Sequence, residues 1–133
     1  MNLLSIGGSD PSSGAGIQSD LKSFAVLDAY GLTTITAITS QNTSKFGNIE
    51  PVSTKILKKQ IESLFSDFQI DGIKIGMVFS SEVIKTIFTF LKKIKVPIII
   101  DPVIKSTTGG MLIKKNAVND FKKYGKVMFV VDI

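Results

Sequence analysis

The chain has 133 residues, a net charge of +5 and 44% apolar residues, which is enough apolar material for a folded core and too much for a disordered tail. All 16 basic residues are Lys, and both Cys and His are absent. The composition therefore excludes disulfides, thiolate nucleophiles, Cys-ligated zinc, Ser-His-Asp catalysis and imidazole general bases. Any chemistry must use carboxylates, Lys, hydroxyls, side-chain amides and backbone N–H groups.

The positive charge does not by itself indicate a nucleic-acid-binding protein. The lysines are scattered along predicted helix faces, and without Arg and Trp the chain lacks a bidentate phosphate ligand and the largest stacking side chain. No apolar stretch approaches the roughly 20 residues of a membrane helix. Residues 1–7 lack the basic region of a signal peptide. We therefore expect a cytoplasmic protein with no nucleic-acid partner and no membrane partner.

Strand-like and helix-like segments alternate from the N-terminus onwards. Residues 2–8 are apolar and end in Gly-Gly, which predicts a buried strand, and the apolar spacing over 16–29 predicts a helix that Gly31 would end. The β-branched run over 32–39 predicts a second strand. We expect a loop over 41–52.

The second half of the chain continues the alternation. Residues 53–68 carry an apolar helical stripe, residues 70–75 predict a third strand, and residues 80–93 predict a third helix. The apolar run over 96–100 predicts a strand that is buried on both faces. A short helix over 114–124 and a fifth apolar strand over 127–131 follow.

This alternation predicts an α/β fold with a mostly parallel central sheet, right-handed connections and helices on both faces. The predicted last strand runs into the C-terminus, with no covering helix after it. Ligands of open α/β sheets bind beyond the carboxyl ends of the strands, so we expect residues 1–133 to lack a loop that would help to build the site. We expect residues 1–133 to form a single partial domain, truncated after about five strands.

Polar or Gly-rich segments follow the first four predicted strands. Because the carboxyl ends of parallel strands meet at one edge of a sheet, these segments predict a small-molecule cleft. They are residues 7–16, 39–43, 76–78 and 101–110.

The first of these segments leaves alternatives open. Gly14-Ala15-Gly16 followed by Ser19 is a broken G-x-G-x-x-G, and only Gln41, rather than an acidic residue, follows the second strand. There is also no G-x-x-x-x-G-K-[ST] sequence. The loop either turns the chain or, through its small residues, lets a ligand approach the backbone closely.

Several motifs in order resemble hydroxymethylpyrimidine and hydroxymethylpyrimidine-phosphate kinases, which are thiamin-pathway enzymes of the ribokinase-like superfamily. The resemblance covers residues 1 to about 120. It is carried by I-G-G-S-D-P-S-S-G-A-G-I-Q-S-D-L-K (6–22), A-Y-G (29–31), T-A-I-T-S-Q-N-T (36–43), D-G-I-K-I-G-M (71–77), D-P-V (101–103) and T-T-G-G-M-L (107–112).

The resemblance implies a ribokinase-like fold and a substrate site for 4-amino-5-hydroxymethyl-2-methylpyrimidine or its monophosphate. The pyrimidine would lie against Gly8 and Ala15, and the Gln41 amide would hydrogen-bond its aminated edge. Asp20, expected in the first turn of the first helix, would accept a hydrogen bond from the ring or its amino group. The helix dipole alone also favours an Asp there.

Two apolar residues complete the implied pyrimidine site. Met77 would pack on the ring or belong simply to the core, and Val103 would close the pocket. On the phosphate side, Asp101 would organise Mg²⁺ through water or cap its loop. Lys105 and the turn that contains Thr107 and Gly109 would face phosphate oxygens.

The resemblance also implies ATP and Mg²⁺ as cofactors and a homodimer. In such kinases the general base and its glycine-rich anion hole follow a T-P-N segment in the second half of the domain, and neither is present in this chain. We therefore expect substrate binding without kinase activity and assign no catalytic residue. Either a second polypeptide supplies the missing half, or the chain is a truncated product. The alternatives are a non-catalytic pyrimidine-binding or assembly subunit, and a fragment of a pyridoxal-type kinase.

Overall fold

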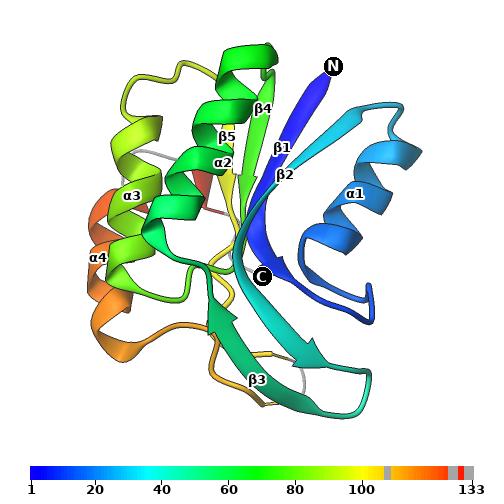
Figure 1. Cartoon of the computed structure of the whole chain (residues 1–133), viewed down its shortest axis with the longest axis vertical. Helices are drawn as coiled ribbons and strands as arrows, with labels where there is room; N and C mark the ends of the chain where they lie inside the picture. The colour runs from blue at the N-terminus through cyan, green and yellow to red at the C-terminus, as the bar shows by residue number, and fades with distance from the viewer. Residues whose placement is uncertain (107–108, 126–128, 131–133) are drawn as a thin grey trace.

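The computed structural model describes residues 1–106, 109–125 and 129–130 as one six-stranded sheet with helices on both faces (Figure 1). The strands are β1 (Asn2–Ser9), β2 (Tyr30–Gln41), β3 (Phe46–Pro51), β4 (Gly72–Ile75), β5 (Ile98–Ile100) and β6 (Phe129–Val130). The helices are α1 (Gly16–Val26), α2 (Thr54–Asp67), α3 (Ser81–Leu91) and α4 (Lys115–Gly125). The strand order is β3-β2-β1-β4-β5-β6, and every pair is parallel except β2–β3. The predicted α/β class and mostly parallel sheet are confirmed.

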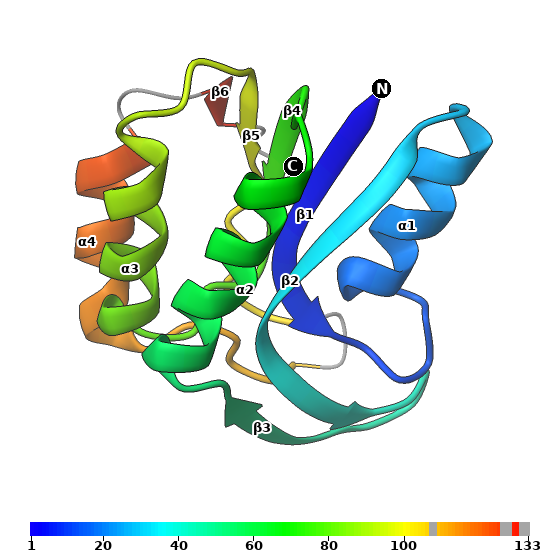
Figure 2. The same cartoon turned by 45° about the horizontal axis from the view of Figure 1, so that its top comes forward.

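The order of the strands decides which face each helix covers. The chain leaves β1 for β2 on one side and later runs outward on the other side, through β4, β5 and β6. Right-handed crossovers then place α1 on one face and α2, α3 and α4 on the opposite face, as Figures 1 and 2 show. The direction changes between β1 and β4. Ligand sites of open α/β sheets lie beyond the strand ends at such a point.

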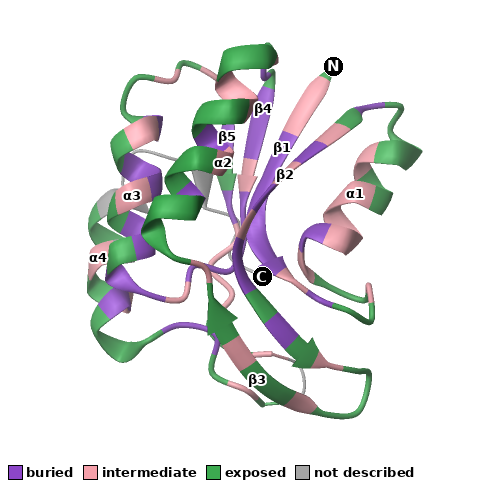
Figure 3. Cartoon of the chain, viewed as in Figure 1, coloured by how far each residue is buried: buried purple, intermediate pink, exposed green. Residues whose placement is uncertain are grey.

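The main core lies between the sheet and α2, α3 and α4. Leu4 and Ile6 of β1 are fully buried there, against Leu57 and Ile61 of α2 and the apolar stripe of α3. Figure 3 shows the burial concentrated on the central strands and on the sheet-facing sides of these helices. None of the helices in the described ranges is long and apolar enough to cross a membrane.

Three details of the fold differ from the sequence prediction. The loop expected over 41–52 is wrong in part, because residues 46–51 form β3, an antiparallel strand at the edge of the sheet. The first helix ends at Val26 rather than at 29. Asp28 has a left-handed φ of 54° just after it, whereas Gly31 lies inside β2. The strand at 96–100 is shorter, and it is not buried on both faces, because Ile99 is 46% exposed.

The expected strand at 127–131 is described only as β6, which pairs in parallel with β5. The rest of that segment lies outside the described residues. With β3 included, the sheet has six strands instead of about five.

Candidate functional site

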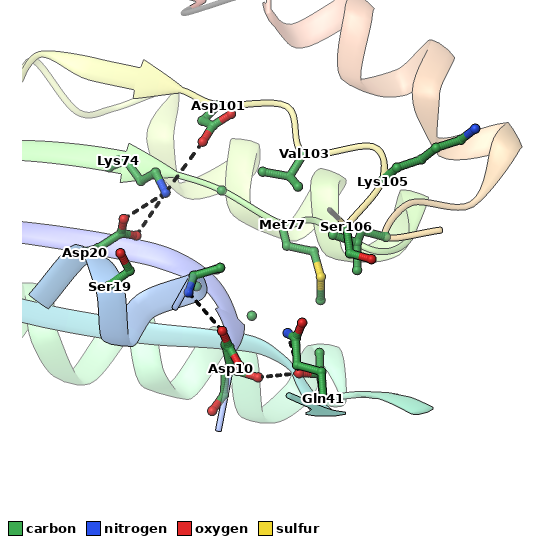
Figure 4. Close-up of a pocket in the computed structure, with 18 residues that line it drawn as sticks. Asp10, Ser19, Asp20, Gln41, Lys74, Met77, Asp101, Val103, Lys105 and Ser106 are labelled. Atoms are coloured by element: carbon green, nitrogen blue, oxygen red, sulfur yellow. Dashed lines mark hydrogen bonds and ion pairs between the residues drawn. The ribbon is translucent and has the colours of Figure 1, made fainter. Parts of the chain in front are cut away.

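A cavity of about 290 Å³ lies beyond the carboxyl ends of β1 and β4, where the strand order reverses. All four segments predicted to converge contribute to its lining. Of the predicted pyrimidine-site residues, all line this cavity: Gly8, Ala15, Asp20, Gln41, Met77 and Val103. The predicted cleft at this edge is therefore present, and Figure 4 shows how its side chains lie.

The loop between β1 and α1 is held in shape by Asp10. One carboxylate oxygen accepts hydrogen bonds from the N–H and the hydroxyl of Ser12 (2.9 and 2.7 Å), and the other accepts from the Ala15 N–H (2.9 Å). Gln18 holds the start of the loop, because its Oε1 accepts from the Asp10 N–H and its Nε2 donates to Ser9 Oγ. Burial raises the pKa of Asp10, but hydrogen bonds from Ser12, Ala15 and Gly14 outweigh burial and hold that pKa below its ordinary value.

Gly16 brings the start of α1 close to the end of β1. It has a φ of +62°, and a Cβ added there would lie 2.5 Å from the Gly8 carbonyl oxygen. Only glycine accommodates both the left-handed backbone and this distance. The loop is thus closed tightly enough for its backbone to form a wall of the cavity.

Gly8 and Met77 form the adjoining wall and are in contact. A Cβ on Gly8 would lie 2.7 Å from Met77 Cε, so a larger residue at position 8 would displace the Met77 side chain. The carbonyl oxygen of Met77 accepts a 2.7 Å hydrogen bond from Thr36 Oγ1. Met77 packs with Ala37 and Leu112 in a small apolar cluster. It therefore belongs to the core and lines the cavity at the same time.

Gln41 stands at the carboxyl end of β2. Its Nε2 donates to Thr39 Oγ1 (3.0 Å), and that hydroxyl donates to the Ser9 carbonyl oxygen (2.8 Å), so the amide is tied to the β1 loop. Figure 4 shows the amide and the thioether end of Met77 pointing toward each other. The carboxamide thus faces the cavity and not away from it.

A group of charged side chains forms the opposite end of the cavity. Lys74 Nζ lies 3.0 Å from both carboxylate oxygens of Asp20 and 3.9 Å from Asp101 Oδ2 (Figure 4). Ser5 Oγ also donates to Asp20 Oδ2, at 2.6 Å. Asp20 is the fifth residue of α1 and not in its first turn, so the expected position in that turn was wrong. The ion pair and the hydroxyl, rather than the helix dipole, are its partners.

The predicted phosphate-side residues are brought together only in part. Asp101 and Lys105 line the cavity, together with Ser106, but Lys105 is exposed and its ammonium points away from the other labelled side chains in Figure 4. Gly109 is exposed in the turn and is not among the lining residues. Thr107 lies outside the described residues.

The described residues include no cluster of carboxylates that would hold Mg²⁺ by themselves. No group of three or more Asp and Glu side chains gathers within the described ranges, and Asp101 already lies beside the Lys74 ammonium. Mg²⁺ needs oxygen ligands, and an adjacent ammonium disfavours a divalent cation.

Sequence reasoning did not single out Lys74 and Asp10 as site residues. A signal existed for Lys74, because a charged residue in the apolar strand G-I-K-I requires a partner if it is buried. For Asp10 the signal was weaker, since an Asp-Pro sequence in a loop is common for turns alone.

Comparisons with known proteins point to one family. The family model described as "Phosphomethylpyrimidine kinase" matches residues 10–131. The hydroxymethylpyrimidine/phosphomethylpyrimidine kinase of Rhizobium meliloti is 44% identical over 115 residues, which cover 86% of this chain and 43% of that protein. The chain spans about half the length of the curated relatives it matches.

Solved structures give the same result. The phosphomethylpyrimidine kinase of Clostridium difficile is 46% identical, with a TM-score of 0.86, covering 93% of this chain and 54% of that one. The pyridoxal kinase of Staphylococcus aureus in complex with pyridoxal is 31% identical, with a TM-score of 0.81, covering 92% and 46%. The S. aureus enzyme is also known in complex with AMP-PCP. With its fold, the position of its cavity and the family match over most of its length, the chain belongs to the phosphomethylpyrimidine kinase family.

Proposed function

We propose that this chain forms the substrate-binding part of a hydroxymethylpyrimidine/phosphomethylpyrimidine kinase. Its ligand would be 4-amino-5-hydroxymethyl-2-methylpyrimidine or the corresponding monophosphate. In the complete reaction, the γ-phosphoryl group of ATP is transferred to the hydroxymethyl oxygen or to the phosphate of the monophosphate. The observation that carries the proposal is the cavity between the glycine-lined β1 loop and the Gln41 amide.

The shape and polarity of this cavity suit a flat, aminated heterocycle. Gly8 and Ala15 present backbone with little side chain, and Met77 and Val103 offer apolar surface to a ring. An amide such as Gln41 provides a donor and an acceptor together, which matches the amino group and ring nitrogen of an aminopyrimidine.

Ligand-induced stabilisation tests the proposal. A ligand that binds only the folded state raises the free energy of unfolding by about 2.7 kcal/mol at a concentration of roughly 100 times Kd. We expect hydroxymethylpyrimidine to raise the Tm of the chain and Gln41→Ala to remove most of this shift. Gln69→Ala, at an exposed position, is the matched control and should keep the full shift. The proposal fails if millimolar ligand leaves the wild-type Tm unchanged.

Pyridoxal is the second candidate ligand, because the S. aureus pyridoxal kinase is similar in fold and sequence. Competition between pyridoxal and hydroxymethylpyrimidine for the same site ranks the two. An ATP-consumption assay with the pure chain then separates a kinase from a non-catalytic pyrimidine-binding or assembly subunit.

The nucleotide, the metal and the partners are further proposals. ATP is the phosphoryl donor that the AMP-PCP complex of the S. aureus enzyme supports. Mg²⁺ is expected from the family alone, and no step is derived through it. The homodimer, the second polypeptide that would supply the remaining family length, and the cytoplasmic location stay predictions.

A further inference from the structure

Lys74 is a charged residue in the middle of the otherwise apolar strand β4. In the sheet it is in register with Ser5 on one side and Ile99 on the other. Its side chain is 24% exposed and points toward α1, on the face opposite the main core. A half-buried ammonium in a central strand is costly unless carboxylates compensate for it.

Asp20 provides most of that compensation. Lys74 Nζ contacts both of its carboxylate oxygens at 3.0 Å, while Ser5 Oγ donates to Oδ2 at 2.6 Å. Three donor contacts from two directions fix the carboxylate plane. A carboxylate accepts about four hydrogen bonds, so one acceptor position remains for a further donor. Because Asp20 also lines the cavity, a bound ligand can supply that donor.

The second carboxylate sets the charge of this end of the cavity. Asp101 Oδ2 lies 3.9 Å from Lys74 Nζ, which is an ion pair but too long for a hydrogen bond. Two carboxylates and one ammonium give the group a net charge of −1. This charge disfavours a phosphate here and favours a neutral group that carries an N–H or O–H.

We propose that Lys74 is a positioning residue that fixes the Asp20 carboxylate as the acceptor for a donor group of the ligand. Through Asp20 it favours heteroaromatic ligands that present an amino or hydroxyl donor at this end of the cavity. This inference rests on the proposed function, because it concerns the same cavity.

Calorimetric titration of the full chain with three probes tests the inference. The probes are hydroxymethylpyrimidine, its analogue without the 4-amino group, and its analogue with methyl in place of hydroxymethyl. We expect wild type to bind hydroxymethylpyrimidine, which keeps both donors, more tightly than the analogue that lacks the donor received by Asp20. We expect Lys74→Met to weaken binding of that probe at least ten-fold while barely changing the probe that lacks the donor. Lys74→Arg keeps a positive charge that can contact both Asp20 oxygens, so it should restore the affinity for that probe and the preference for it over the probe that lacks the donor.

The double variant Lys74→Met/Asp20→Ala separates positioning from a direct contact. If Lys74 acts only through Asp20, the double variant binds as Asp20→Ala alone does. It also removes both charges of the ion pair, so it remains informative if Lys74→Met does not fold. Circular dichroism confirms folding of each variant at the temperature of titration.

The outcomes distinguish this inference from the proposed function. If wild type binds none of the probes, the proposed function fails, and the role of Lys74 fails with it. If wild type binds and Lys74→Met binds equally, or weakens all three probes by the same factor, only the positioning role is overturned. An additional loss in the double variant beyond that of Asp20→Ala also overturns it.

Discussion

Asp10 closes the loop that forms one wall of the cavity, and it does so as a charged acceptor. The residue is 3% exposed, and its two carboxylate oxygens together accept three hydrogen bonds from Ser12 and Ala15. Hydrogen bonds to a charged group are worth about 1.5–3 kcal/mol each where their loss leaves a buried donor unsatisfied. The loop geometry therefore depends on the ionised form of this side chain.

Asp10→Asn should lower the free energy of unfolding by about 1–3 kcal/mol at pH 7. The substitution replaces one carboxylate oxygen by an NH₂ group, which cannot accept a hydrogen bond from the backbone N–H that it faces. Since the folded-state pKa of Asp10 is lowered, its contribution is present above the unfolded pKa of about 3.9 and is lost as pH falls through the folded pKa. The difference in free energy of unfolding between wild type and Asp10→Asn should therefore become smaller as the pH is lowered. Urea unfolding at several pH values measures it, with Asp67→Asn, at an exposed position, as control. A gap that is constant with pH contradicts this role.

Single residues were predictable where position along the chain decided their place. Gln41 and Val103 lie in segments that follow predicted strands, so the carboxyl-end rule placed those segments at the cavity, and the family resemblance singled out the two residues. The role of Lys74 depends on a partner 54 residues away on α1, which no local pattern reveals. That Lys105 and Gly109 face phosphate oxygens stays a prediction, since Lys105 lines the cavity and Gly109 does not.

At the scale of elements, the uncovered edge of β2 is completed by a side chain. β3 pairs with β2 only from Ala37 onwards, so the backbone of Ile35 has no strand on that side. Gln60 of α2 takes its place, because its Oε1 accepts from the Ile35 N–H (2.9 Å) and its Nε2 donates to the Ile35 carbonyl oxygen (3.0 Å). This pair also ties α2 to the sheet.

Gln60→Ala should therefore lower the free energy of unfolding by about 1–3 kcal/mol, because it leaves two backbone groups without their partner. Gln60→Glu should also destabilise, since a carboxylate cannot donate to the carbonyl oxygen. Chemical unfolding gives the free energies, and hydrogen exchange at the Ile35 amide should become faster. Lys59→Ala, on the exposed side of the same helix, serves as the comparison. Equal stability of the Gln60→Ala and Lys59→Ala variants would exclude this bridging role.

The elements that the sequence predicted best were the helices in which apolar residues recur at helical spacing over several turns. The α2 and α3 helices match their predicted spans within one or two residues, because a one-sided apolar stripe and a Ser cap define them. β3 was missed because F-G-N-I-E-P has little apolar alternation and contains Gly and Pro. Only its pairing with the long strand β2 makes it a strand, and that pairing is a tertiary property.

For the whole molecule, the two faces of the sheet are covered unequally. Among the described residues, α2, α3 and α4 lie on one face, while α1 is the one helix on the other, over β1 and β2 (Figure 2). The consequence appears in β5, where neighbouring isoleucines differ sharply: Ile100 is 0% exposed and Ile99 is 46% exposed. The sequence I-I-I could not distinguish them, because an apolar run carries no alternation.

This unequal coverage predicts very different costs for the same substitution at adjacent positions. Ile100→Thr removes buried apolar volume and introduces a buried hydroxyl, so it should lower the free energy of unfolding by about 3 kcal/mol or more. Ile99→Thr should change it by less than about 1 kcal/mol, because Thr keeps the β-branch that suits a strand and the position is half exposed. Urea unfolding of the two single variants of the full chain, compared with wild type, measures both. Similar losses at the two positions would mean that the face bearing Ile99 is packed in solution, and would contradict the layer arrangement described above.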